Sequence, residues 1–323
     1  MQISSPHMGE LMAVLTALTW SFGMFPFTEA AKRLGTNALN LFRLVLAVIL
    51  LSIGTILFTE VSFSDLYTSP TSQHWLWLGI SGIIGLALGD YCGFSAFVLI
   101  GTRLSSVFNT LSPAAALLFG FFINHEQINL IGLTGMTITI GGIIWLSLGK
   151  SEKQRSSHLG PGVYVKGIAF AVLSAICQGV GVALSQRGLN IQVEGSNINA
   201  IHASLIRMIA ATAGVVCIAV LSGRLMQFVL PVFKNKNKGI GYAVAGTVFG
   251  PVIGMTFSMQ AVSLTSASVA QTIFSLLPVF VLVLAHFFYN ERITFKSFLG
   301  AVIAIVGVII LIWRDTIFNS FFS

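Results

Sequence analysis

Three ionisable side chains, Asp90, Arg43 and Arg207, stand inside long apolar stretches of the sequence. A charge in hydrocarbon is costly, so such a residue normally faces a partner or a water-filled cavity. At a rise of about 1.5 Å per residue, Arg43 lies about 7 Å from the end of its stretch, and Asp90 lies about 15 Å from the end of the following one that opens on the same side. The long Arg43 side chain can bridge this difference. Asp90 could therefore form an internal ion pair with Arg43, or it could take up and release a coupling proton.

Aromatic and amide side chains in the same stretches are candidates to line a substrate cavity beside these charges. Each of these residue types also packs between helices, and the sequence does not separate the two roles. The candidates are Trp20, Tyr91, Phe94, Phe108, Asn109, Gln178, Gln260 and Gln271.

Pro113 and Pro278 lie well inside two further stretches. Each proline removes one backbone hydrogen bond and frees the carbonyl four residues earlier. Such breaks are tolerated at membrane depth where protein or a water-filled cavity satisfies the freed group. The two helix breaks therefore indicate either a central cavity or plain kinks that shape the bundle.

Membrane-spanning helices are the elements that must position these residues. Hydrophobic residues make up 55% of the 323-residue chain, charged residues make up 8%, and the mean hydropathy is +0.90, whereas a soluble domain is roughly 25% charged. Continuous apolar runs such as 299–313 lack the alternation of β-barrel strands. We expect no signal peptide, because the amino terminus lacks a basic n-region. Stretches of about 20 residues span a bilayer as helices, and ten are expected at residues 10–31, 38–58, 75–99, 104–124, 129–149, 163–186, 199–222, 239–262, 267–289 and 296–313.

The chain contains two copies of one unit, since residues 85–146 recur without a gap 165 positions later. Five helices per copy is an odd number, so the second copy enters the membrane from the opposite side. We predict an all-α integral membrane protein with ten transmembrane helices in two inverted five-helix repeats, at 9–149 and 163–315, joined by a loop at 150–162. Many secondary transporters have this architecture. Matched pairs include Gly85/Gly250, Gly89/Gly254, Pro113/Pro278, Glu126/Glu291, Gly135/Gly300 and Gly142/Gly307.

The two copies differ at the charged positions. Met255 stands where the first copy has Asp90, and Gln178 stands where the first copy has Trp20. Arg207, the counterpart of Arg43, therefore has no equivalent acid. It either snorkels or bonds to backbone carbonyls or, if it faces the cavity, favours a carboxylate or phosphate on the substrate.

Small residues follow each other at four-residue spacing in the third and eighth stretches. Such a stripe lets another helix backbone approach closely in lipid. It indicates static packing or, as a second interpretation, smooth faces that allow helices to rock. The stripes are Ser81, Gly85, Gly89 and Gly93, and Gly246, Gly250, Gly254 and Ser258.

Short motifs carry a resemblance over nearly the whole chain. They are Leu18-Thr19-Trp20-Ser21-Phe22, Gly89-Asp90-Tyr91, Leu111-Ser112-Pro113, Leu276-Leu277-Pro278, Asn124-His125-Glu126-Gln127-Ile128 and Asn290-Glu291-Arg292-Ile293. With these motifs the sequence resembles the drug/metabolite transporter superfamily, in particular its EamA-type members with two tandem five-helix units. The resemblance implies the fold and a transport activity, and it leaves the substrate open, because one scaffold moves many metabolites.

Basic residues are divided unequally between the two expected sides. Thirteen lie in loops on one side and two, Arg187 and Arg314, lie on the other. The positive-inside rule places the thirteen in the cytoplasm and both termini outside, whereas the family resemblance suggests cytoplasmic termini. The basic loops also account for the net charge of +7 through anionic lipid headgroups, without a nucleic acid partner. The thirteen are Lys32, Arg33, Arg103, Lys150, Lys153, Arg155, Lys166, Arg224, Lys234, Lys236, Lys238, Arg292 and Lys296.

These observations predict a multi-pass plasma-membrane protein (the inner membrane if the cell is Gram-negative) that transports a small metabolite, with a proton as a possible coupling ion. No GxxxxGK[ST] loop is present, so direct ATP coupling is not indicated. We expect no enzyme activity, cofactor or metal, because His125-Glu126 lacks the second histidine of an HExxH zinc site. The alternative is an intramembrane lipid-modifying enzyme or a lipid translocator.

Overall fold

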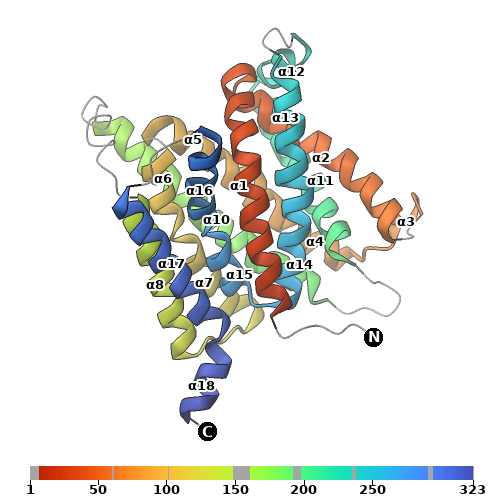
Figure 1. Ribbon diagram of the computed structural model, residues 1–323. Helices are drawn as coiled ribbons and strands as arrows, with labels where there is room; N and C mark the ends of the chain where they lie inside the picture. Colours follow the sequence, from red (N-terminus) through yellow and green to blue (C-terminus); the bar gives the residue numbers. More distant parts are fainter. Residues whose placement is uncertain are drawn as a thin grey trace.

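The computed structural model describes residues 7–59, 62–100, 102–147, 161–191, 198–234, 238–289 and 294–322. Every regular element in these ranges is a helix (Figure 1). The expected first five spans are α1 (Met8–Leu34), α2 (Thr36–Thr59), α4 (Ser72–Gly82) continuing through η1 (Ile83–Gly89) into α5 (Asp90–Ile100), α6 (Thr102–Asn109) with α7 (Ser112–Asn124), and α8 (Leu130–Ser147). The second five are α10 (Pro161–Leu189), α11 (Ala200–Leu221), α13 (Ile240–Thr247) continuing through η2 (Val248–Gly254) into α14 (Met255–Leu264), α15 (Ala267–Phe274) with α16 (Leu277–Tyr289), and α17 (Phe295–Ile312).

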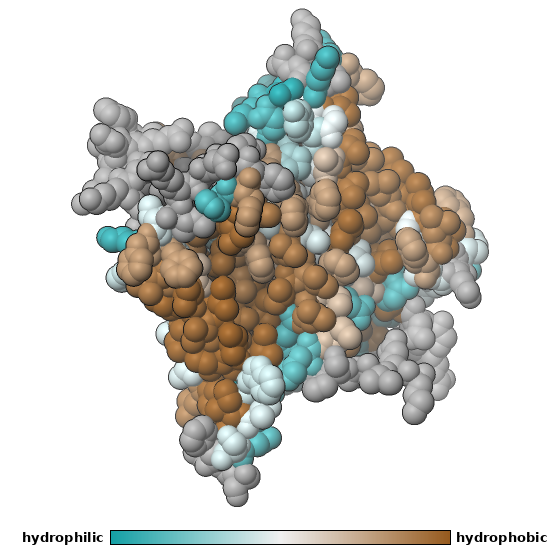
Figure 2. Space-filling view, in the orientation of Figure 1, coloured by the Kyte–Doolittle hydropathy of each residue, from teal (hydrophilic) through white to brown (hydrophobic). Residues whose placement is uncertain are grey.

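Nine helices in the described ranges are long and apolar enough to cross a membrane, and α8, with the slightly shorter apolar run Leu130–Leu146, takes the remaining expected position. Figure 2 shows hydrophobic residues over the middle of one face, with hydrophilic residues towards its ends. The predicted all-helical membrane fold is confirmed. In the described ranges, three short helices lie outside the expected spans: α3 (Asp65–Thr68), α12 (Leu225–Lys234) and α18 (Arg314–Phe322).

The two repeats are inverted and interlocked. In Figure 1, α1 starts at the end of the molecule where both termini lie, and α10 starts at the opposite end. Gly9 at the start of α1 packs on Leu264 and Thr265 at the end of α14, while Gly167 near the start of α10 packs on Ile100 at the end of α5. The first helix of each repeat thus lies along the third span of the other. Residues 150–160 of the expected connecting loop lie outside the described residues.

The small-residue stripes are where these helices meet. Gly85 lies against Gly181 of α10, and Gly250 lies against Gly23 of α1. Each contact is between two backbones with no intervening side chain, so the stripes are packing surfaces in this conformation. Both contacts join one repeat to the other, which leaves the second interpretation, rocking of the same faces, as an expectation about motion.

The third and eighth spans each contain a π-helical segment, which the sequence pattern did not predict. The segments are η1 and η2, and their ends are 165 residues apart at both boundaries. Wide π turns weaken the regular backbone pattern and recur at functional sites. The first segment ends directly before Asp90 and the second directly before Met255.

The fourth and ninth spans are each divided into two helices beside a proline. Pro113 lies in the first turn of α7, and Pro278 is the second residue of α16. A proline is tolerated there because the first turn needs no amide donor. Hydroxyl groups bind carbonyls at both breaks: Thr110 Oγ1 donates to Val107 at 2.6 Å, and Ser275 Oγ donates to Gln271 at 2.9 Å.

The last spans of the two repeats, α8 and α17, pack on each other at glycines that correspond between the repeats. A Cβ atom on Gly142 would overlap the Ala304 amide and lie 2.8 Å from the Gly300 carbonyl oxygen. A Cβ atom on Gly135 would lie 2.8 Å from the Leu311 amide nitrogen. Only glycine permits this close approach of backbones.

Gly142→Ala is expected to destabilise the protein by about 1–3 kcal/mol, since the two helices must separate to admit a methyl group. The neighbouring Gly141 faces open space, with nothing within 4 Å of an added Cβ atom. Gly141→Ala is therefore the matched control, and we expect it to change stability by less than about 1 kcal/mol. Thermal unfolding in detergent compares the two variants. Equal midpoints would contradict the crossing described here.

Candidate functional site

An ion pair lies in the first repeat, inside the helical bundle. Arg43 Nη2 of α2 pairs with Asp90 Oδ2 at the start of α5. Arg43 Nε also donates to Asn40 Oδ1 at 3.0 Å, one turn earlier on its own helix. The guanidinium carbon lies 5.2 Å from the ring centre of Phe94 and 5.9 Å from that of Phe27. The Arg43 charge is therefore matched by one carboxylate and bordered by aromatic rings.

The second repeat completes this site through α10. Gln178 Nε2 donates to Asp90 Oδ1 at 2.8 Å and lies 3.3 Å from the Gly85 carbonyl. Ser174, one turn earlier, donates to the Gly89 carbonyl at 2.8 Å. These donors satisfy two carbonyls of the π segment η1 from outside the helix, which backbone of irregular geometry requires at membrane depth. The position where the repeats differ most, Gln178 against Trp20, is thus in direct contact with Asp90.

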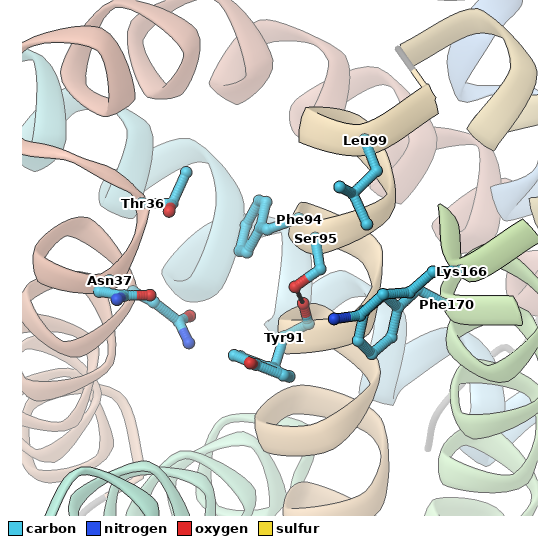
Figure 3. Close-up of a pocket in the computed structure, with 9 residues that line it drawn as sticks. Thr36, Asn37, Tyr91, Phe94, Ser95, Leu99, Lys166 and Phe170 are labelled. Carbon is cyan, nitrogen blue, oxygen red and sulfur yellow. Dashed lines mark hydrogen bonds between the residues drawn. The ribbon is translucent and has the colours of Figure 1, made fainter. Parts of the chain in front are cut away.

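A cavity of about 290 Å³ adjoins the ion pair, between the starts of α2 and α10 and along α5 (Figure 3). Asn40 and Phe94 contact Arg43 and also line this cavity, so the pair lies next to its wall. The cavity lining combines amides, hydroxyls, aromatic rings and one lysine. It comprises Thr36, Asn37, Asn40, Tyr91, Phe94, Ser95, Leu99, Lys166 and Phe170.

Arg207 occupies the corresponding position in the second repeat but has different neighbours. The residue is 2% exposed, and its Nη1 atom lies 3.3 Å from Met255 Sδ and 3.4 Å from Met259 Sδ. Its Nε has no hydrogen-bond partner in the described structure. Nη2 is 3.4 Å from the position of a Cβ atom on Gly85 in η1. Arg207 therefore approaches the same π segment whose carbonyl Gln178 binds.

The remaining candidate residues are distributed over the bundle. Tyr91 lines the cavity, edge-on to the Phe170 ring at 6.3 Å. Trp20 packs on Gly254 and against Phe274, with ring centres 5.3 Å apart. Gln271 Nε2 donates to Ser112 Oγ at 2.9 Å, beside the break in the fourth span.

Asn109 and Gln260 are placed away from the cavity lining, and Asn109 is exposed at the end of α6. Most cavity residues were not predicted from the sequence, among them Lys166, Asn37 and Phe170. Lys166 and Asn37 stand near helix starts, where a polar residue usually indicates only solvent, so composition carried no signal. Phe170 is one of 26 phenylalanines in the chain, and no pattern distinguished it.

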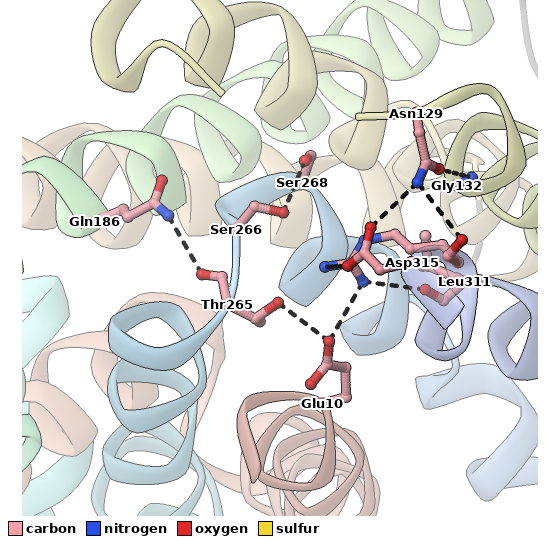
Figure 4. Close-up of polar contacts among 10 residues, drawn as sticks. Glu10, Asn129, Gly132, Gln186, Thr265, Ser266, Ser268, Leu311 and Asp315 are labelled. Carbon is pink, nitrogen blue, oxygen red and sulfur yellow. Dashed lines mark hydrogen bonds and ion pairs between the residues drawn. The ribbon is translucent and has the colours of Figure 1, made fainter. Parts of the chain in front are cut away.

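The end of the molecule that carries the termini is held together by polar contacts (Figure 4). Glu10 of α1 pairs with Arg314 at 3.3 Å and accepts a hydrogen bond from Thr265 Oγ1 at 3.4 Å. Gln186 of α10 donates to the Thr265 carbonyl at 3.2 Å and accepts from Asn124 of α7 at 2.8 Å. These contacts connect both repeats. We call this set, with Glu126 below, the terminal-side cluster.

Glu126 joins the terminal-side cluster to the start of α15. Its carboxylate accepts from the Ala267 amide at 2.5 Å and from Ser268 Oγ at 2.9 Å, at the first turn of α15. A helix amino terminus favours a negative charge. His125 makes this possible, because its left-handed conformation (φ 56°) ends α7 and turns the chain towards α15. Its repeat counterpart, Glu291, lies outside the described residues.

The part of the chain that the structure describes contains no group of three or more His, Cys, Asp or Glu side chains that could hold a metal ion.

The comparisons with known proteins agree with this architecture. A model of the EamA-like transporter family matches residues 7–148 and 165–313, which are most of both repeats. The chain belongs to the EamA-like transporter family. Its fold is thus a membrane-transporter fold with two repeats, as the motifs predicted.

Two proteins and one solved structure are similar to this EamA-like chain. An uncharacterized transporter of Clostridium kluyveri is 21% identical over 306 residues, covering 94% of this chain and 92% of that protein. An uncharacterized transporter of Archaeoglobus fulgidus is 36% identical over 78 residues, covering 24% of this chain and 28% of that protein. A crystal structure with 17% identity and a TM-score of 0.72 covers 98% of this chain and 99% of its own, which supports the fold alone.

Proposed function

We propose that this EamA-like protein is a secondary transporter that moves a small metabolite through the cavity between α2, α5 and α10. The observation that carries the proposal is the difference between the two ends of the molecule. One end has a cavity of about 290 Å³ beside the Arg43–Asp90 pair, and at the other end the contacts of the terminal-side cluster join the two repeats. Inverted repeats can exchange such open and closed ends, which exposes one site alternately to each side.

The cavity has the size and lining of a site for a small amphipathic molecule. Phe94, Phe170 and Tyr91 offer apolar surface, while Asn37 and Lys166 offer hydrogen-bond donors. A few polar groups among aromatic side chains are typical of small-molecule sites. A lipid-modifying enzyme or a lipid translocator is the alternative, and the experiment below separates it from transport of a soluble metabolite.

The cavity lies towards the end of the molecule that carries the basic loops, beside Lys166 and close in sequence to Arg33, which is followed by the lining residues Thr36 and Asn37. Under the positive-inside rule this end faces the cytoplasm and the terminal-side cluster faces outward. Labelling of cysteines placed near Lys234 tests the orientation. An impermeant reagent should not reach them in intact cells, and labelling from outside would reverse our assignment.

Coupling to a proton at Asp90 is the second part of the proposal. In this conformation Asp90 holds Arg43 and accepts from Gln178, so protonation would weaken two contacts at once and release α5 from α2 and α10. A proton taken up at Asp90 would then be linked to helix movement, which is what coupling requires.

Ser95→Trp tests the cavity itself, because Ser95 lines it and a large ring there would fill it. We expect at least a tenfold loss of uptake into proteoliposomes, assayed with labelled amino acids, organic acids, sugars and nucleosides. The control is Val45→Trp on the surface of α2, where Val45 is 41% exposed. Unchanged uptake by Ser95→Trp would place the route elsewhere, and movement of labelled phospholipid instead of metabolites would favour the lipid translocator.

A further inference from the structure

Arg207 is a buried cation that forms no ion pair with the described residues, and Asp90, which pairs with Arg43, attracts it only from beyond salt-bridge distance. Its side chain belongs to α11 and lies among α11, η1 and α14, with 2% exposure. The ion pairs of the described residues do not include it. Its hydrogen bonds go to Met255 and Met259 thioethers, which are weak acceptors, and its Nε is unpaired. Burial of a charge without a partner costs free energy. The presence of Arg207 at this position therefore needs an explanation other than stability of the fold.

The repeat shows what is missing. In the first repeat Arg43 pairs with Asp90, the residue directly after η1. In the second repeat Arg207 contacts Met255, the residue directly after η2. The positions correspond, and Met255 stands in place of the acid. These positions hold two guanidiniums, Arg43 and Arg207, and one carboxylate, Asp90. The interior therefore carries one excess positive charge at these positions.

Arg207 also lies close to the polar groups at the cavity wall. Its Nη2 atom is 3.4 Å from the position that a Cβ atom on Gly85 would occupy, so the guanidinium packs directly against η1. The Gly85 carbonyl accepts from Gln178, which also binds Asp90 beside the cavity. Arg207 is thus one π turn away from the polar group at the cavity wall.

We infer that Arg207 binds the negatively charged group of the transported molecule, a carboxylate or a phosphate. This inference rests on the proposed function and names its substrate class. A guanidinium presents parallel donors that match either group. Arg207 is the counterpart in the second repeat of Arg43, which lies beside the cavity in the first repeat. It becomes accessible when the end that carries the terminal-side cluster opens, and the substrate anion then supplies the charge that Met255 does not.

Arg207→Met tests the inference without knowledge of the substrate. Removal of an uncompensated charge among Met255 and Met259 is expected to raise the midpoint of thermal unfolding by roughly 2–4 °C. A structural role for Arg207 predicts the opposite, a lower midpoint. Arg43→Met is the matched control, because it leaves Asp90 unpaired and is expected to lower the midpoint.

Transport supplies the second readout, with labelled amino acids and 2-oxo acids in one arm, sugar phosphates in another, and sugars and nucleosides in a third. We expect the wild-type protein to take up solutes from one of the two charged arms only. The arm that is taken up tells whether the protein binds a carboxylate or a phosphate. Arg207→Met should reduce this uptake at least tenfold, and Arg207→Lys should retain part of it. Uptake of uncharged solutes alone, or wild-type anion uptake by Arg207→Met, would overturn the inference while the transporter proposal stands. A wild-type protein that moves no solute from any arm contradicts the proposed function and, with it, the inference.

Discussion

Asp90→Asn is expected to abolish pH-dependent transport and to destabilise the protein by about 3–5 kcal/mol, the cost of removing one partner of a buried ion pair. The pair is well shielded, with side-chain exposures of 10% for Arg43 and 17% for Asp90. Asparagine retains the shape and can still accept from Gln178. It carries no charge, so the Arg43 guanidinium is left with Asn40 and two aromatic rings.

A double variant separates the structural part of this effect from the functional part. Arg43→Met with Asp90→Leu removes both charges and leaves no uncompensated ion, so most of the lost stability should return. Transport should not return, because neither the coupling carboxylate nor its partner remains. Thermal unfolding of Arg43→Met, Asp90→Leu and the double variant forms a double-mutant cycle, whose coupling energy measures the pair directly.

Uptake into proteoliposomes with and without a pH gradient decides whether Asp90 carries a proton. Full pH dependence in Asp90→Asn would remove the proton proposal and leave Asp90 as an ion-pair partner of Arg43. Loss of transport with unchanged stability would contradict the structural half of the expectation, since the buried pair would then contribute nothing to folding.

The sequence could predict the parts of this site that depend on regular helices and on the repeat. Depth along two neighbouring spans was enough to place Arg43 near Asp90. Comparison of the copies was enough to mark Gln178 and Met255 as the positions that differ. Both rest on a fixed rise per residue and a fixed offset, which the fold preserves.

The sequence could not predict the parts that depend on irregular backbone or on distant contacts. The π segment η1 is stabilised from outside, because Ser174 and Gln178 on another helix donate to its carbonyls. The contact of Glu126 with Ala267 joins residues 141 positions apart. Neither arrangement produces a periodic pattern of residues in the sequence, so only the packed structure reveals it.

Glu126→Ala is expected to open the end of the molecule that carries the termini. The variant loses the carboxylate that binds the first turn of α15, where the Ala267 amide and the Ser268 hydroxyl donate to it. A hydrogen bond to a charged group contributes about 1.5–3 kcal/mol, and a change of 1.4 kcal/mol shifts a conformational equilibrium about tenfold. The open population should therefore rise at least about tenfold, provided that the open state lacks this contact.

Reactivity of a buried thiol measures this opening. With Cys92, Cys177 and Cys217 replaced by serine, Ala183→Cys on α10 provides the reporter, since Ala183 is 0% exposed and its carbonyl accepts from Asn124 of the terminal-side cluster. Glu126→Ala should raise its labelling rate by an impermeant maleimide about tenfold, the same equilibrium shift. A reporter at the exposed Gln127 should label equally in both backgrounds.

Two further variants keep the interpretation specific to this contact. Glu126→Gln retains the shape and one acceptor oxygen but loses the charge at the α15 amino terminus, so its labelling rate should fall between those of wild type and Glu126→Ala. Glu29→Gln removes an acid from the other end, where it pairs with Lys32 and Arg33, and should leave the rate unchanged. Equal rates in wild type and Glu126→Ala would mean that α15 is held closed by apolar packing alone. The terminal-side cluster would then be a consequence of closure, and the gate would have to be sought in the buried residues of α15.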